Sequence, residues 1–190
     1  MKEDKEAQGV LFDPIKHIYT DPKTDRRLPS VTQVVHDVSG SEHFAEPWHL
    51  QRGSMIHRAV TLYLGERLDE STVDPRIRGR VNSAIRAIKE LNIQPTLIEF
   101  RMKHKLYGFA GTPDLLAGNT LIDWKSSKMK ETGPQMGGYV LLLEAHGYKV
   151  KTCLEIILED DRYIIHEHKT APNRAIFLAA LTVYKWKHST

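Results

Sequence analysis

Apolar residues recur at helical spacing in five stretches of the chain. The clearest begins at Asp74-Pro75, an N-cap residue followed by a proline at the first helical position, and its apolar stripe runs to Leu91. Another begins at Ser30, where Gln33 completes a capping box, and is expected to end near Ser39-Gly40. The same spacing predicts three more helices, over residues 47–64, 134–146 and 172–187.

Shorter apolar runs bounded by glycine or turn residues predict strands between the helices. These runs cover residues 96–103, 107–117, 120–126, 149–158 and 162–167. Residues 10–20 fit an irregular hairpin broken by Pro14. Helices, three strands, a helix, two strands and a helix in this order predict a mixed α/β (α+β) fold with a central sheet flanked by helices. We expect residues 1–9 to form a disordered tail and residues 10–190 a single domain.

Composition narrows the class of protein only slightly. A net charge of +3 and a pI near 8.9 permit a polyanionic partner without requiring one. Cys153 is the only cysteine, which excludes an intrachain disulfide and any cysteine-only metal cluster. The sequence contains no apolar run long enough to span a bilayer and no secretory signal, so it predicts a cytoplasmic protein without a membrane segment.

The stretch Leu121-Ile122-Asp123-Trp124-Lys125 carries the first candidate chemistry. Side chains alternate faces along a strand, so Asp123 and Lys125 are expected on one face and Trp124 on the other. An acid and a base on an apolar strand lose solvation unless they have partners. A structural ion pair, or an edge strand with one wet face, is the simpler interpretation of this pattern alone.

Two further carboxylates precede this strand. The segment Gly111-Thr-Pro-Asp114 ends one neighbouring strand, and Glu99 lies between apolar residues of another. Glu99 by itself also fits a solvated strand face. Together with Asp123, these carboxylates would repel one another unless a cation or Lys125 lies among them. Mg²⁺ typically binds one or two carboxylates together with waters and a phosphate, so the cluster indicates a metal site.

These residues resemble the signature of the PD-(D/E)xK nuclease superfamily. Pro113-Asp114 followed by Asp123-Trp124-Lys125 matches the general pattern. Gly111 three residues before the first aspartate, and Trp124 between Asp123 and Lys125, are similar to the RecB-like exonuclease branch. Gly53-Ser-Met-Ile-His57 resembles the Gly-x-x-x-His helix motif of that branch, and Gln135-Met-Gly-Gly-Tyr139 resembles its Gln-x-x-x-Tyr motif.

The resemblance extends more loosely toward the amino terminus and has two departures. Pro29-Ser-Val-Thr32 is similar to a segment near the start of phage RecB-like exonucleases and of the mitochondrial genome maintenance exonuclease. Gly137-Gly138 is unusual inside a helix. The four cysteines that hold an iron–sulfur cluster in some relatives are absent, so none is expected. Thr132-Gly-Pro-Gln135 also reads as a capping box, and Tyr139 as a core residue.

The resemblance implies a restriction-endonuclease-like core and a Mg²⁺- or Mn²⁺-dependent deoxyribonuclease. Water activated by the metal would hydrolyse DNA phosphodiester bonds in recombination, repair or replication. The implied metal ligands are His57, Asp114, Asp123 and the backbone carbonyl of Trp124. The implied catalytic set is Asp114, Asp123, Lys125, Glu99, Gln135 and Tyr139. A lone helical histidine is more often a surface or capped residue, and imidazole would favour Mn²⁺ over Mg²⁺.

Basic residues bracket the implied site. They are Lys128 and Lys130 on one side and Arg101, Lys103 and Lys105 on the other. Such residues give affinity for DNA phosphates without sequence preference, although an ordinary solvated loop has the same composition. Single-stranded DNA or duplex ends are the expected partner, with replication or recombination proteins as further partners. The alternative function is a catalytically silent nucleic-acid-binding or assembly module on the same fold.

Overall fold

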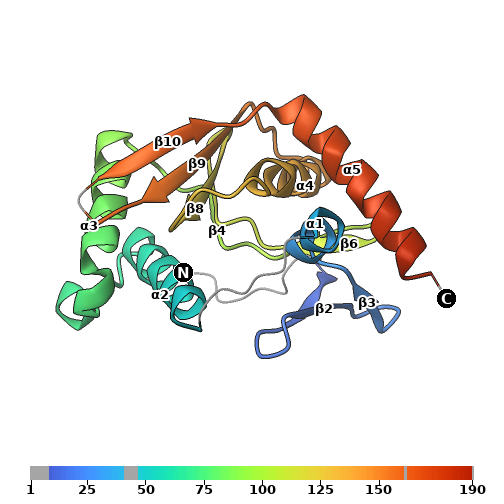
Figure 1. Ribbon diagram of the computed structural model, residues 1–190, viewed down its shortest axis with the longest axis horizontal. Coiled ribbons are helices and arrows are strands. Elements are labelled where there is room, and N and C mark those ends of the chain that lie inside the picture. Colours follow the sequence, from blue (N-terminus) through green and yellow to red (C-terminus); the bar gives the residue numbers. More distant parts are fainter. Residues whose placement is uncertain (1–8, 41–46, 161, 190) are drawn as a thin grey trace.

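A mixed five-stranded sheet forms the centre of the computed structural model, which describes residues 9–40, 47–160 and 162–189 (Figure 1). The strand order is β10-β9-β8-β7-β4, and β8 and β9 pair in parallel while the other neighbours pair antiparallel. The strands are β4 (Leu97–Ile98), β7 (Leu115–Ala117), β8 (Thr120–Lys125), β9 (Thr152–Leu158) and β10 (Tyr163–Glu167). The predicted tail falls almost wholly outside the described residues.

Within the described residues, two smaller sheets and five α-helices complete the fold. One small sheet holds β1 (Leu11–Asp13), β2 (Ile18–Asp21) and β3 (Arg26–Leu28), and the other holds β5 (Met102–His104) and β6 (Phe109–Gly111). The helices are α1 (Val31–Ser39), α2 (Pro47–Leu64), α3 (Pro75–Glu90), α4 (Thr132–Ala145) and α5 (Thr170–Lys187). A short 3₁₀ helix, η2, covers Glu70–Thr72. The mixed α+β fold with a helix-flanked sheet is therefore confirmed.

Local sequence signals account for the starts of two helices. The side chain of Ser30 accepts a hydrogen bond from the backbone of Gln33, and the Gln33 side chain accepts one from the backbone of Ser30. The side chain of Asp74 accepts from the backbone N–H of Arg76 at the start of α3. Both predicted caps are confirmed. The capping box predicted at Thr132 is wrong, because Glu131 is the N-cap residue of α4 and makes no side-chain cap.

The two faces of the sheet bury separate apolar cores. Leu115 and Ile122 pack with α2 and α3, whereas Leu116 and Leu121 pack with α1, α4 and α5. Because strand side chains alternate, Asp123 shares the face of Leu121, which is the face covered by α4. The sheet therefore directs the candidate acidic residue toward a helix.

Two of the predicted strands are each broken in the middle. The stretch 96–103 divides at Glu99, whose φ of 43° lies in the left-handed region and ends β4 before β5 begins. The stretch 107–117 divides at Thr112-Pro113, between β6 and β7, where Pro113 has no N–H to donate to a ladder. Both breaks occur beside Asp114. The interruptions place this residue at a bend instead of inside a regular strand.

The glycine pair inside α4 permits close packing against α5. A Cβ on Gly137 would lie 2.2 Å from the backbone oxygen of Asn173, and one on Gly138 would lie 2.7 Å from the Phe177 ring. Both approaches are too close for a side chain, so the contact itself requires glycine. This explains a departure from ordinary helix composition that the sequence alone could not explain.

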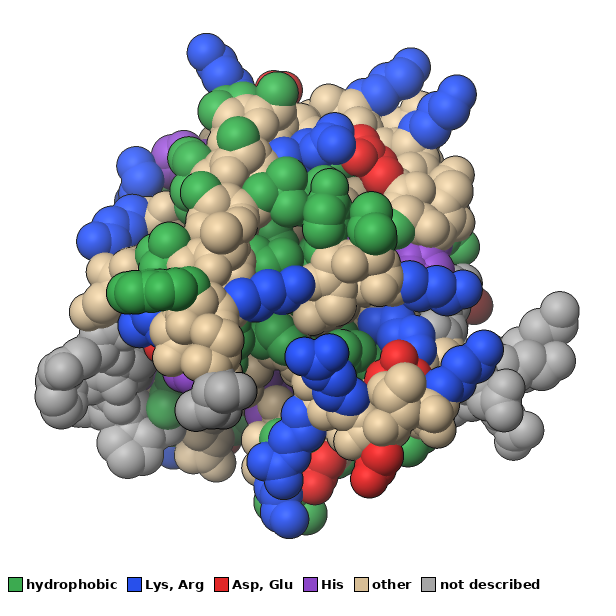
Figure 2. Space-filling model, turned by 90° about the vertical axis from the view of Figure 1, so that its right-hand side faces the viewer, with side chains coloured by type: hydrophobic (Ala, Val, Ile, Leu, Met, Phe, Trp, Pro, Cys, Tyr) green, Lys and Arg blue, Asp and Glu red, His purple; other side chains and the backbone are tan. Residues whose placement is uncertain are grey.

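The outer side of α5 carries exposed apolar residues. Ile176, Val183 and Trp186 are 51%, 41% and 76% exposed. Figure 2 shows hydrophobic side chains gathered on the side of the molecule where α5 lies, with lysine and arginine side chains around them. Among the described residues, none of the helices combines the length and apolar character needed to cross a membrane.

Candidate active site

The two aspartates of the motif lie side by side on neighbouring strands. Leu115 pairs with Ile122 in the antiparallel β7–β8 ladder, so Asp114, one residue before β7, lies opposite Asp123. The backbone N–H of Trp124 donates to Asp114 Oδ2 at 2.9 Å, and the N–H of Glu99 donates to the Asp114 carbonyl at 2.8 Å. Asp123 is 1% exposed. Backbone contacts from two strands thus fix two carboxylates next to each other.

Lys125 and Gln135 complete a hydrogen-bonded cluster around Asp123. The Lys125 ammonium lies 2.6 Å from Asp123 Oδ2 and donates to Gln135 Oε1 at 3.2 Å. The amide nitrogen of Gln135 donates to Asp123 Oδ1 at 3.3 Å and to the Tyr139 hydroxyl at 3.1 Å. Gln135 therefore bridges the acid, the base and the tyrosine, from the helix that covers this face of the sheet.

His57 approaches the same carboxylates from α2. Its Nδ1 lies 3.5 Å from Asp114 Oδ2, and its side chain is 30% exposed. A Cβ on Gly53, one turn earlier, would meet no atom of the described residues within 4 Å. The space beside the imidazole is thus open, as the Gly-x-x-x-His spacing suggested.

Burial and mutual repulsion perturb the pKa values of these groups. Burial, reinforced by repulsion from Asp114 and opposed by Lys125, raises the pKa of Asp123 to about 6. Burial would also raise the pKa of Asp114, but His57 and Lys125 outweigh it and hold that pKa below its ordinary value. Burial opposes the charge on His57, yet the Asp114 and Asp123 carboxylates raise its pKa to about 9. The carboxylates likewise raise the pKa of Lys125 against burial.

The side chains of the site supply part of the coordination that a divalent cation needs. Among the described residues, no three histidine, cysteine, aspartate or glutamate side chains converge as a ready-made metal cage. Asp123 Oδ2 is nevertheless buried without a well-aligned hydrogen-bond donor, although the Lys125 ammonium lies close to it. Two adjacent carboxylates, one buried and one half-buried, with one such oxygen suit Mg²⁺ or Mn²⁺, which complete their coordination with water and phosphate.

The remaining predicted site residues are more scattered. Glu99 is exposed and accepts a hydrogen bond from the Thr61 hydroxyl at 2.9 Å. The Arg101 guanidinium lies 5.1 Å from the centre of the Phe12 ring. Lys103 is only 6% exposed, and its ammonium lies 2.6 Å from Asp21, so it is not available to a DNA phosphate in this structure. Lys105, Lys128 and Lys130 are exposed, as a phosphate-binding role requires.

Sequence reasoning missed a buried carboxylate next to the site. Glu155 of β9 pairs in register with Asp123 and is 1% exposed. Its Oε1 accepts from the Thr132 hydroxyl at 2.9 Å, and its Oε2 lies 3.0 Å from His168 Nε2. An acidic residue inside the apolar strand sequence Thr152–Leu158 was a usable signal for Glu155. Nothing in the sequence indicated Thr132 or His168.

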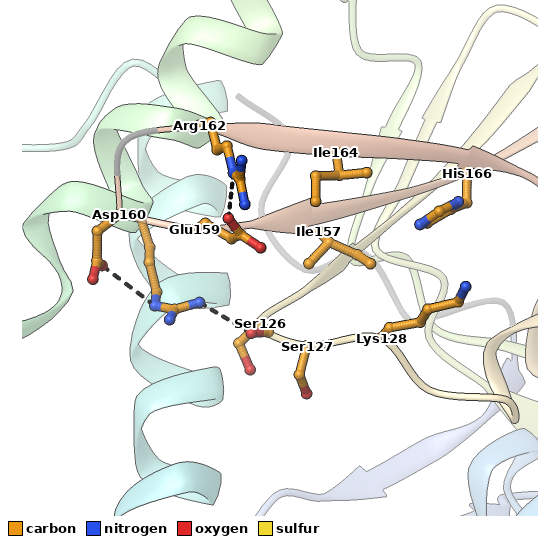
Figure 3. A pocket seen from close by; sticks show the side chains of 10 residues that line it. Ser126, Ser127, Lys128, Ile157, Glu159, Asp160, Arg162, Ile164 and His166 are labelled. Carbon is orange, nitrogen blue, oxygen red and sulfur yellow. Dashed lines mark hydrogen bonds and ion pairs between the residues drawn. The ribbon is translucent and has the colours of Figure 1, made fainter.

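Two clefts border the cluster, and a further hollow lies beyond the end of β8. A cleft of about 510 Å³ is bordered by His57, Lys125 and Gln135, and one of about 280 Å³ is bordered by Glu99, Asp114 and Tyr139. A third, of about 800 Å³, begins at Ser126-Ser127, where β8 ends, and reaches β10 (Figure 3). The candidate active site is therefore open to a polymer on more than one side.

No protein-family model matches the chain, and neither does any curated protein. Among solved structures, the chain is similar to an alkaline exonuclease (LHK-Exo) from Laribacter hongkongensis, with 18% sequence identity and a TM-score of 0.43. The similarity covers 80% of this chain and 77% of that one. The assignment that follows rests on the geometry of the site.

Proposed function

We propose that the chain is a divalent-metal-dependent nuclease of the PD-(D/E)xK type, RecB-like, that hydrolyses phosphodiester bonds in DNA. The observation that carries this proposal is the cluster in which Asp114, Asp123 and Lys125 meet at one end of the sheet, with Gln135 bridging the acid and the base. The cluster borders two clefts. We place the enzyme in DNA recombination, repair or replication, acting as an exonuclease on strand ends.

Asp114 and Asp123 would hold a Mg²⁺ or Mn²⁺ ion, with His57 and the Trp124 carbonyl as additional ligands. Such an ion supplies a water of lowered pKa and offsets the charge that develops on the phosphate. His57 must lose its proton to serve as a ligand, because only the neutral imidazole binds a metal.

Lys125 provides a positively charged hydrogen-bond donor at the site. Its raised pKa keeps it protonated at neutral pH, so it can donate hydrogen bonds but cannot act as a base. We assign it to orienting the attacking water and stabilising the phosphate charge in the transition state. Gln135 accepts from the ammonium and thereby fixes its direction. Tyr139 supports Gln135 through its hydroxyl.

The proposed DNA-binding residues are Arg101, Lys105, Lys128 and Lys130. The three lysines among them are exposed and lie in the segments that follow β5 and β8. Lys103 is left out of this surface because Asp21 already neutralises it. Contacts of this kind would hold DNA through its phosphates and weaken steeply with salt.

The decisive assay is cleavage of end-labelled single-stranded and double-stranded DNA, with a circular single strand to separate exonuclease from endonuclease action. Wild type, Asp114→Asn and Lys125→Ala are compared in Mg²⁺, in Mn²⁺ and in EDTA. Asp37→Asn is the matched control, since Asp37 pairs with Lys187 away from the site. We expect metal-dependent cleavage by the wild type and the control, and loss of cleavage in the other two.

Equal activity in all four proteins, or cleavage in EDTA, would contradict the proposed mechanism. DNA binding with no cleavage by the wild type under any condition would instead identify a catalytically silent nucleic-acid-binding module. Shortening of labelled linear strands without cutting of the circle would support the exonuclease assignment.

A further inference from the structure

The cleft of about 510 Å³ beside the site is lined by basic residues. Its ionisable lining residues are His36, His49, Arg52, His57 and Lys125, and no carboxylate lines it among the described residues. The hydroxyls of Thr32, Ser126 and Ser127 also border it. The cleft therefore offers donors and positive charge, the chemistry that recognises an anion.

Arg52 is the residue in this cleft whose hydrogen bonding is incomplete. It lies on α2 directly before Gly53, and its Nε–H is buried without a hydrogen-bond acceptor among the described residues. A buried donor on a charged group is unfavourable unless an acceptor reaches it. In the part of the chain that the structure describes, no atom lies within 4 Å of where a Cβ on the adjacent Gly53 would be.

Arg80, in contrast, has its guanidinium hydrogen-bonded within the protein. Arg80 donates to the backbone carbonyls of Ser126 and Leu158, and its Nε lies 3.4 Å from Asp160 Oδ1. Burial lowers the pKa of the Arg52 guanidinium, the like charge of Arg80 lowers it further, and the charge of Asp160 opposes both. Arg80 is thus committed to contacts within the protein, whereas the Arg52 Nε–H has no acceptor among the described residues, although the charge of Asp160 acts favourably on the Arg52 guanidinium.

We infer that Arg52 binds a phosphate of the DNA strand in this cleft, next to the phosphate that is hydrolysed. The inference rests on the proposed function, because it names the part of the substrate that the same site holds. Lys125 and Gln135 line the same cleft, so an anion bound there shares the cleft with groups of the candidate active site. A guanidinium fork binds a phosphodiester through two parallel hydrogen bonds, which a lone ammonium cannot do.

The groove in Figure 3 adjoins the cleft that Arg52 lines and extends the proposed route of the DNA strand away from Arg52. The two hollows share Ser126 and Ser127. Beyond these residues, Lys128 and His166 face each other across the groove, with Ile157 and Ile164 beside them (Figure 3). Its carboxylates do not oppose a phosphate strongly, because Glu159 is paired with Arg162 and Asp160 with Arg80.

The test is equilibrium binding of a fluorescent single-stranded oligonucleotide, measured by anisotropy in EDTA so that no cleavage occurs. Arg52→Ala is compared with Arg58→Ala, which removes an exposed arginine from the same helix. We expect Arg52→Ala to weaken binding on the order of tenfold and to reduce the slope of log affinity against log salt by about one. Arg58→Ala should change the affinity by less than about twofold. Arg52→Lys should recover the salt slope but only part of the affinity.

Wild-type affinity and salt slope in Arg52→Ala would overturn the inference. If Arg52→Ala fails to fold, as judged by its thermal transition, Arg52→Gln takes its place and the same criterion applies. A second arm measures stabilisation by inorganic phosphate alone. Phosphate stabilisation that depends on Arg52, with unchanged oligonucleotide binding, would also overturn the inference, since the site would then serve free phosphate.

The test of the Arg52 phosphate site and the test of the proposed function can fail independently of each other. Loss of oligonucleotide binding in Arg52→Ala, in a protein that cleaves no DNA, would support the phosphate site and contradict the nuclease. Metal-dependent cleavage by a wild-type protein, with Arg52→Ala binding and cutting equally well, would support the nuclease and contradict the site.

Discussion

At the scale of single residues, the site balances a buried and a half-buried carboxylate against two cationic side chains. Asp114 pairs with His57 and Asp123 with Lys125. The balance is incomplete, because Asp123 has a raised pKa of about 6 and one poorly satisfied oxygen. His57, with a pKa of about 9, is protonated at neutral pH when no metal is bound and then acts as a cation beside Asp114. A divalent cation would take over that role.

Metal affinity should therefore rise with pH. Protons compete with the cation at His57 below a pH of about 9 and at Asp123 below a pH of about 6. We expect the apparent affinity for Mn²⁺, measured by calorimetric titration, to increase steadily across this range. His57→Ala should lower the affinity at high pH and remove the pH dependence above neutrality. An affinity for Mn²⁺ that stays constant between these two pH values in the wild type would contradict the pairing described.

At the scale of secondary-structure elements, the placement of α4 decides the geometry of Gln135. The first residue of the helix, Thr132, donates to Glu155 of β9, and both side chains are buried. His168, which follows β10, contacts the other oxygen of Glu155. Since α4 has no side-chain N-cap, this buried hydrogen bond is what joins its start to the sheet. Gln135 lies one turn later.

Thr132→Val tests that anchor, because the substitution keeps the shape of the side chain and removes the hydroxyl. One oxygen of a buried carboxylate then loses its donor, which should lower the free energy of unfolding by about 1–3 kcal/mol. Thr182→Val is the control, since Thr182 is exposed on α5 and should change stability by less than about 0.5 kcal/mol. Chemical denaturation measures both. Equal stability of the two variants would mean that the hydrogen bond does not hold α4.

The contact between α4 and α5 gives a second prediction at this scale. Gly137→Ala should destabilise the protein by about 1–3 kcal/mol, because its Cβ would lie 2.2 Å from the backbone oxygen of Asn173. Gly53→Ala, also helical, adds a Cβ that meets no described residue within 4 Å and should stabilise the protein by up to about 1 kcal/mol. Thermal and chemical unfolding would show these opposite signs. A stabilised Gly137→Ala protein would contradict the close packing.

At the scale of the whole molecule, the sequence predicted the helices and the sheet better than the paths between them. Regular periodicity and the caps at Ser30 and Asp74 sufficed for the helices, because those signals are local. The break at Glu99 was not predictable, since its left-handed backbone is imposed by surrounding structure. The cluster of Asp123, Lys125 and Gln135 followed from motif spacing. Glu155 and Arg52 did not, because their significance depends on contacts with distant segments.

Contacts between segments that are distant in the sequence also assemble the candidate site. The strand β8 carries Asp123 and Lys125, α2 carries Arg52 and His57, and α4 carries Gln135. The sheet and the helices on its two faces therefore meet at one end, where the clefts open. We propose that the site at this end of the sheet hydrolyses DNA with the help of a divalent metal.

The most direct measurement is the single-turnover rate of cleavage of an end-labelled DNA strand by the wild type and by Asp123→Asn. Each preparation is first stripped with EDTA and then supplied with Mn²⁺. The account predicts no cleavage before Mn²⁺ is added, cleavage by the wild type afterwards, and a rate lower by a factor on the order of a hundred or more in Asp123→Asn. Equal rates in the two proteins, or cleavage by the stripped wild type, would contradict it.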